Sequence, residues 1–201
     1  MYARRAPLAL ALALAAAPLA RAAAAPPASG PVGGNQWAVL LGLEDGYGDT
    51  GLQLRGDLEF AQRPISPQIG FSIVGSLGYS HFSRTYTDFA TGESAEAKLD
   101  LLKLVPAARF SLGVAPFRFY ADGGLGLYWG GAGVKHRDPF GGVIASASDS
   151  SVGILMRFAV GAQIHVSPAV ALGAELGFSP YFADIPDDTF TSLLLSASFR
   201  M

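Results

Sequence analysis

The amino-acid sequence predicts an all-β fold, an eight-stranded antiparallel up-and-down β-barrel that spans a membrane. Along 51–60, every second residue is apolar or glycine, while Arg55, Asp57 and Glu59 occupy the other parity. Successive side chains of a strand point to opposite faces, so this segment has one apolar and one charged face. The pattern recurs about eight times, with alternately short and long connections, as in a transmembrane barrel.

The N-terminal residues are typical of an export signal and not of the fold. Arg4 and Arg5 precede an apolar stretch, and small residues follow, so 1–25 is predicted to be a cleaved secretory signal peptide, with the cleavage site open within Ala22–Ala25. Residues 26–35 are rich in Ala, Pro and Gly and are predicted to be a flexible segment. The chain has no cysteine, which excludes a lipid-modified N-terminus and disulfides. Residues 36–201 form one predicted domain.

The alternation places the strands in order along this domain. We expect them at 36–43, 51–62, 68–80, 99–112, 117–129, 152–166, 170–178 and 190–201, with a bulge at Pro106, which lacks a backbone donor. The connections 63–67, 114–116 and 167–169 are short, whereas 44–50, 81–97, 130–151 and 179–189 are longer. Bacterial barrels have short periplasmic turns and long outer loops, so both termini are predicted to be periplasmic. The stretch 140–148 is more apolar than a solvated loop should be. We expect it to extend the strands at 117–129 and 152–166 beyond the membrane, in preference to contacting a partner protein.

The direction of the apolar face separates two kinds of barrel. A lipocalin-type soluble barrel would turn it inward around a small ligand. Here the polar face consists largely of Gly, Ser and Ala with isolated charges, which suits a crowded interior better than a soluble exterior. The apolar face is therefore predicted to contact outer-membrane lipid. A net charge of −2 argues against a nucleic-acid partner.

The C-terminal strand carries a further pattern. Leu193, Leu195, Phe199 and Met201 alternate with smaller or polar residues up to the final position. This resembles the assembly signal that the insertion machinery recognises, with Met201 where Phe is usual. With these residues, 36–201 resembles the eight-stranded outer-membrane barrels of the OmpA transmembrane-domain and opacity-protein type. The resemblance implies a barrel integral to the cell outer membrane.

Charged residues of the inward parity form the first candidate site. These residues are Arg55, Asp57, Glu59, Lys103, Arg109, Arg118, Asp122, Arg157 and Glu175. An isolated buried charge costs several kcal/mol, so we expect these groups to pair. A static plug is favoured over a narrow ion channel, because about eight strands leave little more than side-chain room.

Two further possibilities concern enzyme and metal chemistry. His81 and Ser83, followed by Glu93 and Glu96, resemble the His-x-Ser pair of outer-membrane lipid A deacylases, although the surrounding family sequence is absent. No spacing of His, Asp or Glu predicts a metal site, and we expect no cofactor. The leading prediction is a non-enzymatic barrel with a structural or surface-interaction role, in which loops 81–97 and 130–151 offer any recognition surface.

Overall fold

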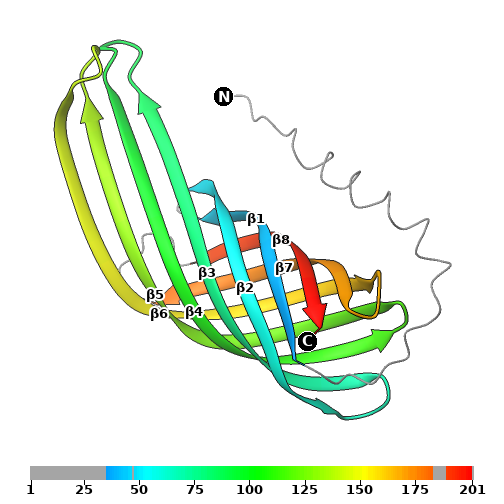
Figure 1. Ribbon diagram of the computed structural model, residues 1–201. Helices are drawn as coiled ribbons and strands as arrows, with labels where there is room; N and C mark the ends of the chain where they lie inside the picture. Colours follow the sequence, from blue (N-terminus) through cyan, green and yellow to red (C-terminus); the bar gives the residue numbers. More distant parts are fainter. Residues whose placement is uncertain (1–34, 47, 183–188, 201) are drawn as a thin grey trace.

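The computed structural model describes residues 35–46, 48–182 and 189–200, so the predicted signal peptide and nearly all of 26–35 lie outside the described residues. Eight antiparallel strands form one closed ring in chain order, and β8 pairs with β1 (Figure 1). Their bounds are β1 Gln36–Gly46, β2 Asp49–Pro64, β3 Ile69–Thr87, β4 Ser94–Val114, β5 Phe117–Arg137, β6 Val143–His165, β7 Val170–Phe182 and β8 Thr189–Arg200. The predicted eight-stranded up-and-down barrel is confirmed.

Alternation along each strand separates an outward apolar face from an inward polar face. On β2, the side chain of Leu54 is 49% exposed, whereas the neighbouring Arg55 is 3% exposed. The same contrast holds on β5, where Leu125 points outward and Tyr128 is fully buried. The ring therefore carries its apolar side chains on the outside, as predicted, and encloses a set of buried charged ones. Among the described residues, no helix is long and apolar enough to cross a membrane.

The predicted bulge at Pro106 is wrong. Pro106 pairs with Gly75 of β3 without a register shift, and the ladder to β5 merely lacks pairs between Leu104↔Leu127 and Ala107↔Gly124. In this register Pro106 lies opposite Leu125, whose neighbours Gly124 and Gly126 have no side chains, and a Cβ at either would collide with the backbone of β4. Glycine on the partner strand thus accommodates the proline. An irregularity occurs instead in β2 between Phe60 and Arg63, where Ala61 has a φ of 51°.

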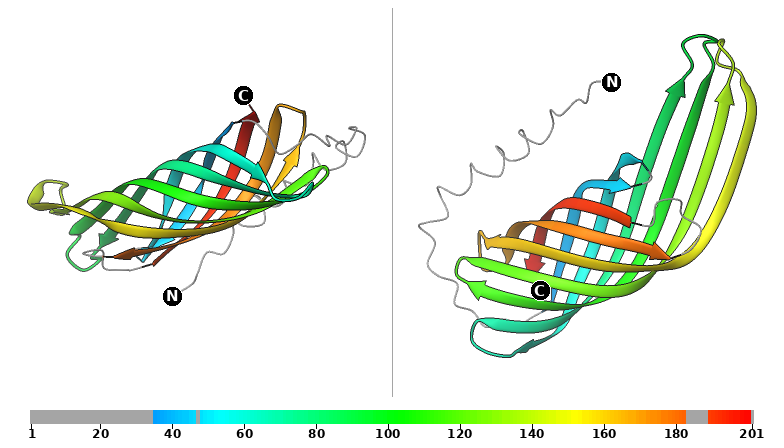
Figure 2. Two further views of the ribbon diagram at one scale, coloured as in Figure 1. Left: turned by 90° about the horizontal axis from the view of Figure 1, so that it is seen from below. Right: turned by 180° about the vertical axis from the view of Figure 1, so that it is seen from behind.

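The long connections are shorter than predicted because the strands continue into them. Most of 81–97 is strand, since β3 runs to Thr87 and β4 begins at Ser94, and most of 130–151 belongs to β5 and β6. The strand extension predicted for 140–148 is confirmed from Val143 onward. Figures 1 and 2 show β3, β4, β5 and β6 continuing well past the other four strands. We call the part of these four strands that starts at the row of His81, Asp100, Gly131 and Ser150 and continues to the turns the outer sheet.

The outward face changes character where the outer sheet begins. The last apolar row across the four strands is Tyr79, Leu102, Trp129 and Val152. The next outward row is His81, Asp100, Gly131 and Ser150. Toward the end that holds both Gln36 and Arg200, Trp37 stacks on Phe199 with ring centroids 4.5 Å apart. Aromatic rings at both limits of an apolar band are typical of membrane interfaces. On the side of the outer sheet, the membrane boundary therefore lies between the last apolar row, which contains Trp129, and the next outward row, which contains His81.

Candidate functional site

The barrel interior brings the predicted charged residues together. All nine are buried, and Glu44, which was predicted to lie in a loop, joins them because β1 continues past Leu43 and keeps the inward parity. The buried basic residues of the described chain are Arg55, Lys103, Arg109, Arg118 and Arg157, and the buried acidic residues are Glu44, Asp57, Glu59, Asp122 and Glu175. The two signs balance, as a low-dielectric interior requires.

The part of the interior nearest the outer sheet contains the pair Lys103 and Glu44. Nζ of Lys103 donates to both carboxylate oxygens of Glu44, at 2.5 and 2.6 Å. The same ammonium lies 5.6 Å from the ring centroid of Tyr181 and 5.9 Å from that of Phe190. Aromatic rings attract a nearby cation, so the Lys103–Glu44 pair also contacts the aromatic side chains Tyr181 and Phe190.

The middle of the interior is organised around Arg55. Its guanidinium donates to both oxygens of Asp57, at 2.8 and 3.0 Å, and to Glu175 across the barrel at 2.7 Å. Tyr120 adds a hydroxyl hydrogen bond of 3.0 Å to the same Glu175 carboxylate. Arg157 donates to Ser76 at 2.7 Å. Bidentate guanidinium–carboxylate pairs are geometrically specific. Arg55 and Asp57 lie on the same strand, whereas the contacts of Glu175 with Arg55 and Tyr120 tie β7 to β2 and β5.

The part of the interior nearest Gln36 and Arg200 is centred on Glu59. Arg118 forms two hydrogen bonds to this carboxylate, Ser72 donates to it at 2.8 Å, and Arg109 approaches it at 3.3 Å. Arg109 also donates to Asp122, with Nη2 to Oδ2 at 2.5 Å. Each carboxylate is thus shared by several donors, which offsets the desolvation of the buried charges.

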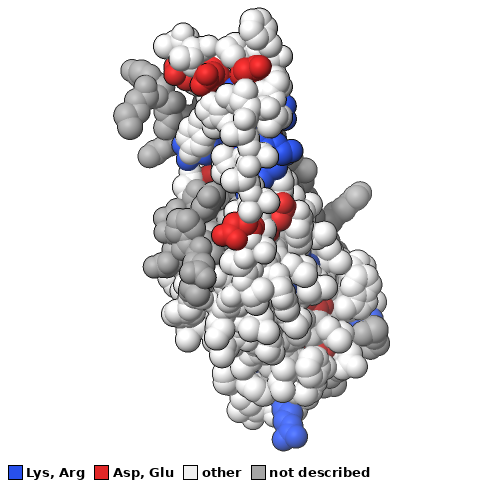
Figure 3. All heavy atoms as spheres, turned by 90° about the vertical axis from the view of Figure 1, so that its left-hand side faces the viewer, with Lys and Arg blue, Asp and Glu red and all other residues white. Residues whose placement is uncertain are grey.

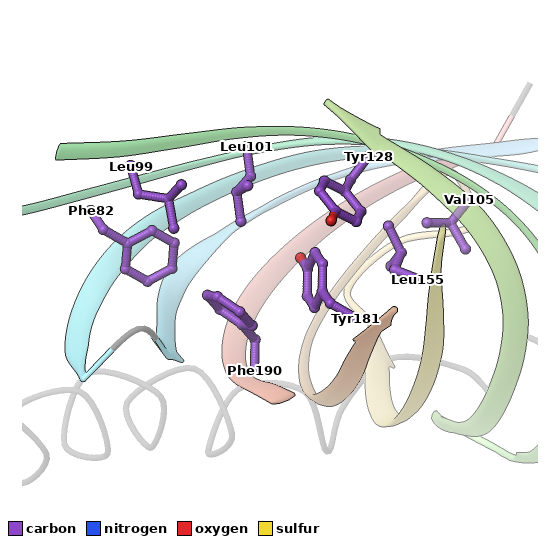
Figure 4. Close-up of a cluster of buried hydrophobic side chains, with 8 residues drawn as sticks. All are labelled: Phe82, Leu99, Leu101, Val105, Tyr128, Leu155, Tyr181 and Phe190. Atoms are coloured by element: carbon purple, nitrogen blue, oxygen red, sulfur yellow. The ribbon is translucent and has the colours of Figure 1, made fainter. Parts of the chain in front are cut away.

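An aromatic and aliphatic cluster closes the interior on the outer-sheet side of the charges. Its buried members are Phe82, Leu99, Leu101, Val105, Tyr128, Leu155, Tyr181 and Phe190, and we call it the apolar plug. Their side chains point into the barrel toward one another (Figure 4). Tyr181 contacts Phe190 at 4.7 Å between ring centroids and Tyr128 at 5.1 Å. This cluster was not predicted from the sequence, because its residues are brought together by the register between strands.

Little open volume remains between the buried charged residues and the apolar plug. A cavity of about 10 Å³ lies among Arg55, Lys103, Leu155 and Arg157, which is close to the minimum for one water molecule. A larger cavity of about 320 Å³ opens at the mouth lined by Gln36, Arg118 and Arg200. The described interior therefore narrows from this mouth to a filled centre.

The residues of the possible enzyme site lie on the outward face of the outer sheet. His81 does not pair with either predicted glutamate: Glu93 contacts His136 at 3.1 Å, and Glu96 contacts Lys98 at 2.8 Å. Instead, Nδ1 of His81 lies 2.7 Å from Oδ1 of Asp100, its cross-strand partner on β4. Tyr79 donates its hydroxyl to the same oxygen at 2.5 Å. Asp100 was not predicted, although cross-strand register would have indicated it.

The outer sheet has two different faces. Its outward face carries polar and charged residues such as Lys98 and Lys135, whereas on its inward face Ala132 packs against the apolar plug and Val134, farther out, is exposed. Figure 3 shows acidic side chains gathered near the upper end of the molecule and basic side chains below them. Loops 81–97 and 130–151 thus form a rigid surface, built mainly of paired strands.

The residues of the predicted assembly signal lie on β8. Leu193 and Leu195 are exposed on the outward face, and Phe199 stacks on Trp37 of β1. Met201 lies outside the described residues. The pairing of β8 with β1 closes the ring at this position.

Comparison with known proteins identifies the family. A family model described as "Outer membrane protein beta-barrel domain" matches residues 6–200. A major outer membrane protein from Thermus thermophilus is similar in structure, with a TM-score of 0.55, 15% identity, and coverage of 84% of this chain and 100% of that chain. Neisserial surface protein A gives a TM-score of 0.54 and 13% identity, with 83% and 96% covered. The comparison with curated protein sequences finds no relative.

These identities show the fold alone, whereas the family match spans almost the whole chain. The predicted resemblance to eight-stranded outer-membrane barrels is confirmed. The apolar outward band, the charged interior and the family match lead to one conclusion: this chain belongs to the outer membrane protein beta-barrel domain family and is an integral outer-membrane protein.

Proposed function

We propose that this protein is a non-enzymatic outer-membrane barrel that acts through its outer sheet, in surface interaction. The observation that carries the proposal is the continuation of four strands beyond the ring, on the side where the interior is closed by the apolar plug. A strand needs only about 9–11 residues to cross a membrane, and β6 has 23. The additional length serves no spanning purpose and builds a surface outside the lipid.

The filled interior supports a plug role for the charge network in preference to conduction. Opening a path would require separating bidentate pairs such as Arg55–Asp57 in a low-dielectric interior, and it would also require moving Tyr181 and Phe190. Separating the ion pairs alone leaves the apolar plug closed, and moving Tyr181 and Phe190 alone leaves the charge network closed. The narrow-channel alternative therefore needs two coupled rearrangements.

The same features support an orientation for the protein. With the outer sheet and its charged tips facing the exterior, Gln36 and Arg200 lie on the periplasmic side. Residues 1–25 act as the export signal, and the insertion machinery recognises Leu193, Leu195, Phe199 and Met201. Protease added to intact cells is expected to cleave within the hairpin turns, and epitope tags at the C-terminus should remain protected.

Shortening the two hairpins tests the proposed function. Tight turns would replace 84–97 and 133–148, which leaves the ring and the charge network intact. Cells that carry only the shortened chain should retain detergent resistance and lose adhesion to surfaces. A shortened chain that restores both properties would support a purely structural role and overturn the surface-interaction proposal. Heat-dependent gel mobility of each chain confirms that the barrel has folded.

The hydrogen bond between His81 and Asp100 favours a second candidate function, hydrolysis of an acyl ester of the outer leaflet. Asp100 would orient the imidazole, His81 would accept the proton of Ser83, and the serine oxygen would attack the ester carbonyl. The lipid alcohol would leave with the proton from His81, and water would then hydrolyse the acyl-serine to release the fatty acid and restore Ser83. The row of His81 and Asp100 lies just past the apolar band, at the depth of lipid ester groups. Mass spectrometry of lipid A from cells carrying wild type, Ser83→Ala or Asp100→Asn decides this candidate. Identical acylation in all three excludes it.

A further inference from the structure

Two phenylalanines at the tips of the outer sheet are almost completely exposed. Phe89, in the turn between β3 and β4, is 97% exposed, and Phe140, in the turn between β5 and β6, is 98% exposed. The other large apolar side chains that are exposed in the described chain reach at most 62%. Burying a phenylalanine side chain gives one of the largest gains in free energy that a single residue can contribute. Two fully exposed rings at the tips of the outer sheet therefore require an explanation.

Each ring is presented by a hydrogen-bonded turn. In the first turn, the backbone N–H of Gly92 donates to the carbonyl of Asp88 at 2.8 Å, and the N–H of Asp88 donates to Glu93 at 2.9 Å. Gly92 adopts a φ of +73°, which suits glycine. The carboxylate of Asp88 accepts the N–H of Ala90 at 2.9 Å, and this contact lowers the pKa of Asp88 and keeps it ionised.

The second turn has the same construction. The carboxylate of Asp138 accepts the N–H of Phe140 at 2.9 Å and that of Gly142 at 2.7 Å. Gly141 has a φ of +87°. The two turns also abut, since a Cβ on Gly92 would lie 3.3 Å from Cβ of Pro139. The backbone that carries the two aromatic rings is therefore ordered before any partner arrives, which reduces the backbone entropy lost on binding.

The size of this tip favours a lipid surface over a protein partner. Two phenylalanines offer roughly 300–500 Å² of contact area. A stable protein interface buries about 800 Å² on each partner, and the rest of the two turns adds only Ala90 and Pro139 as apolar side chains, followed by the half-exposed Val143. Two rings on a narrow protrusion are sufficient, by contrast, to enter the boundary between headgroups and acyl chains.

The charges behind the rings indicate which lipid surface fits. Asp88, Glu93 and Asp138 lie in the turns, and Lys135 and Arg137 lie at the end of β5, just before Asp138. Figure 3 shows the acidic side chains at the upper end with basic ones beneath them. This mixture offers no excess of cations for an anionic membrane and matches a zwitterionic headgroup layer, which carries both signs.

We infer that Phe89 and Phe140 form a docking tip that inserts into a zwitterionic phospholipid surface facing the outer membrane, such as the phosphatidylcholine leaflet of another cell. The inference rests on the proposed surface-interaction function and assigns it a partner. The pinned turns present the rings, and the rigid outer sheet carries them beyond the protein's own membrane.

Co-flotation tests the inference with the full mature chain held in lipid nanodiscs. The nanodiscs are mixed with phosphatidylcholine vesicles and centrifuged in a sucrose gradient, with empty nanodiscs as the blank. Wild type should float with the vesicles, and the double variant Phe89→Ser/Phe140→Ser should float roughly tenfold less. The matched control Val134→Ser/Ile144→Ser removes two other exposed apolar side chains of the same sheet and should float like wild type.

The outcomes separate the possible explanations. Absence of wild-type flotation, equal loss in both double variants, or no loss in the phenylalanine variant would each overturn lipid docking, and a protein partner would then be the occupant of the tip. Stronger flotation with phosphatidylglycerol vesicles would overturn the zwitterionic assignment. Since the hairpin-shortening experiment measures cell adhesion without these vesicles, surface interaction stands or fails independently of this result.

Discussion

Two tyrosines of β5 show how single residues determine the packing of the interior. Tyr120 faces Gly161 across the ladder to β6, and Tyr128 faces Gly153. A Cβ on Gly153 would lie 2.6 Å from the ring of Tyr128, and one on Gly161 would collide with the ring of Tyr120. Each glycine therefore provides the space in which a cross-strand aromatic ring lies flat against the barrel wall.

Replacing Gly153 with alanine tests this role. The added methyl group must displace Tyr128 from the apolar plug, so Gly153→Ala should lower the free energy of unfolding by about 1–3 kcal/mol. Gly56→Ala is the matched control, because Gly56 is also a strand glycine and nothing lies within 4 Å of its Cβ position. Urea unfolding in vesicles measures both. Equal effects of the two substitutions would show that the space above Gly153 is not needed.

The pair Lys103 and Glu44 gives a second residue-scale prediction. Lys103→Met leaves a buried carboxylate without its cation, and we expect a loss of about 3–5 kcal/mol in the free energy of unfolding. The double variant Glu44→Gln/Lys103→Met removes both charges and should lie within about 1 kcal/mol of wild type. Urea titration of wild type, the two single variants and the double variant gives the coupling energy. A Lys103→Met chain as stable as wild type would mean that water solvates Glu44.

At the scale of the elements, the period of two in the sequence was sufficient to predict the ring. It gave the strand order and the inward parity, because an apolar outward face and a polar inward face produce one consistent alternation. The same rule failed for the outer sheet. There the outward positions become polar, as at Ser83 and Lys98, while Phe82 and Leu99 carry the apolar parity. This reversal hid the continuing strands and led to the prediction of loops.

The site was less predictable than the ring, for a geometric reason. The inward charges could be found from parity alone, but their partners depend on the stagger between strands. Phe190 of β8, for example, meets Phe82 of β3 across the barrel, with ring centroids 5.5 Å apart. Asp100 faces His81 only in the observed register. Such contacts are properties of the closed ring, and a single strand contains no information about them.

The change of polarity along β5 gives an element-scale prediction. Leu125 points outward within the apolar band, and Gly131 points outward six residues later, with nothing within 4 Å of its Cβ position. Leu125→Arg should reduce the free energy of folding into lipid vesicles by about 2–4 kcal/mol, whereas Gly131→Arg should be nearly neutral. Equal losses would place the membrane boundary beyond Gly131 and contradict the assigned limit of the lipid-facing band.

At the scale of the whole molecule, the interior is closed by two layers of different chemistry. The apolar plug closes the side of the outer sheet, and the charge network fills the barrel beneath it. The two layers touch where Lys103 lies under Tyr181 and Phe190. The apolar plug is held by packing and the charge network by ion pairs. Removing the apolar plug should therefore leave the charge network closed.

A single cysteine can distinguish these layers, since the chain has none of its own. Ser80 is fully buried on the inward face of β3, two residues before Phe82. Ser80→Cys should resist a small thiol reagent in the otherwise native chain and react once Phe82, Tyr181 and Phe190 are replaced by alanine. Both chains should remain without conductance in a planar bilayer, because Arg55, Arg157 and their carboxylates still fill the centre. Conductance steps in the native chain would show that both layers open together, and the channel hypothesis would then replace the plug.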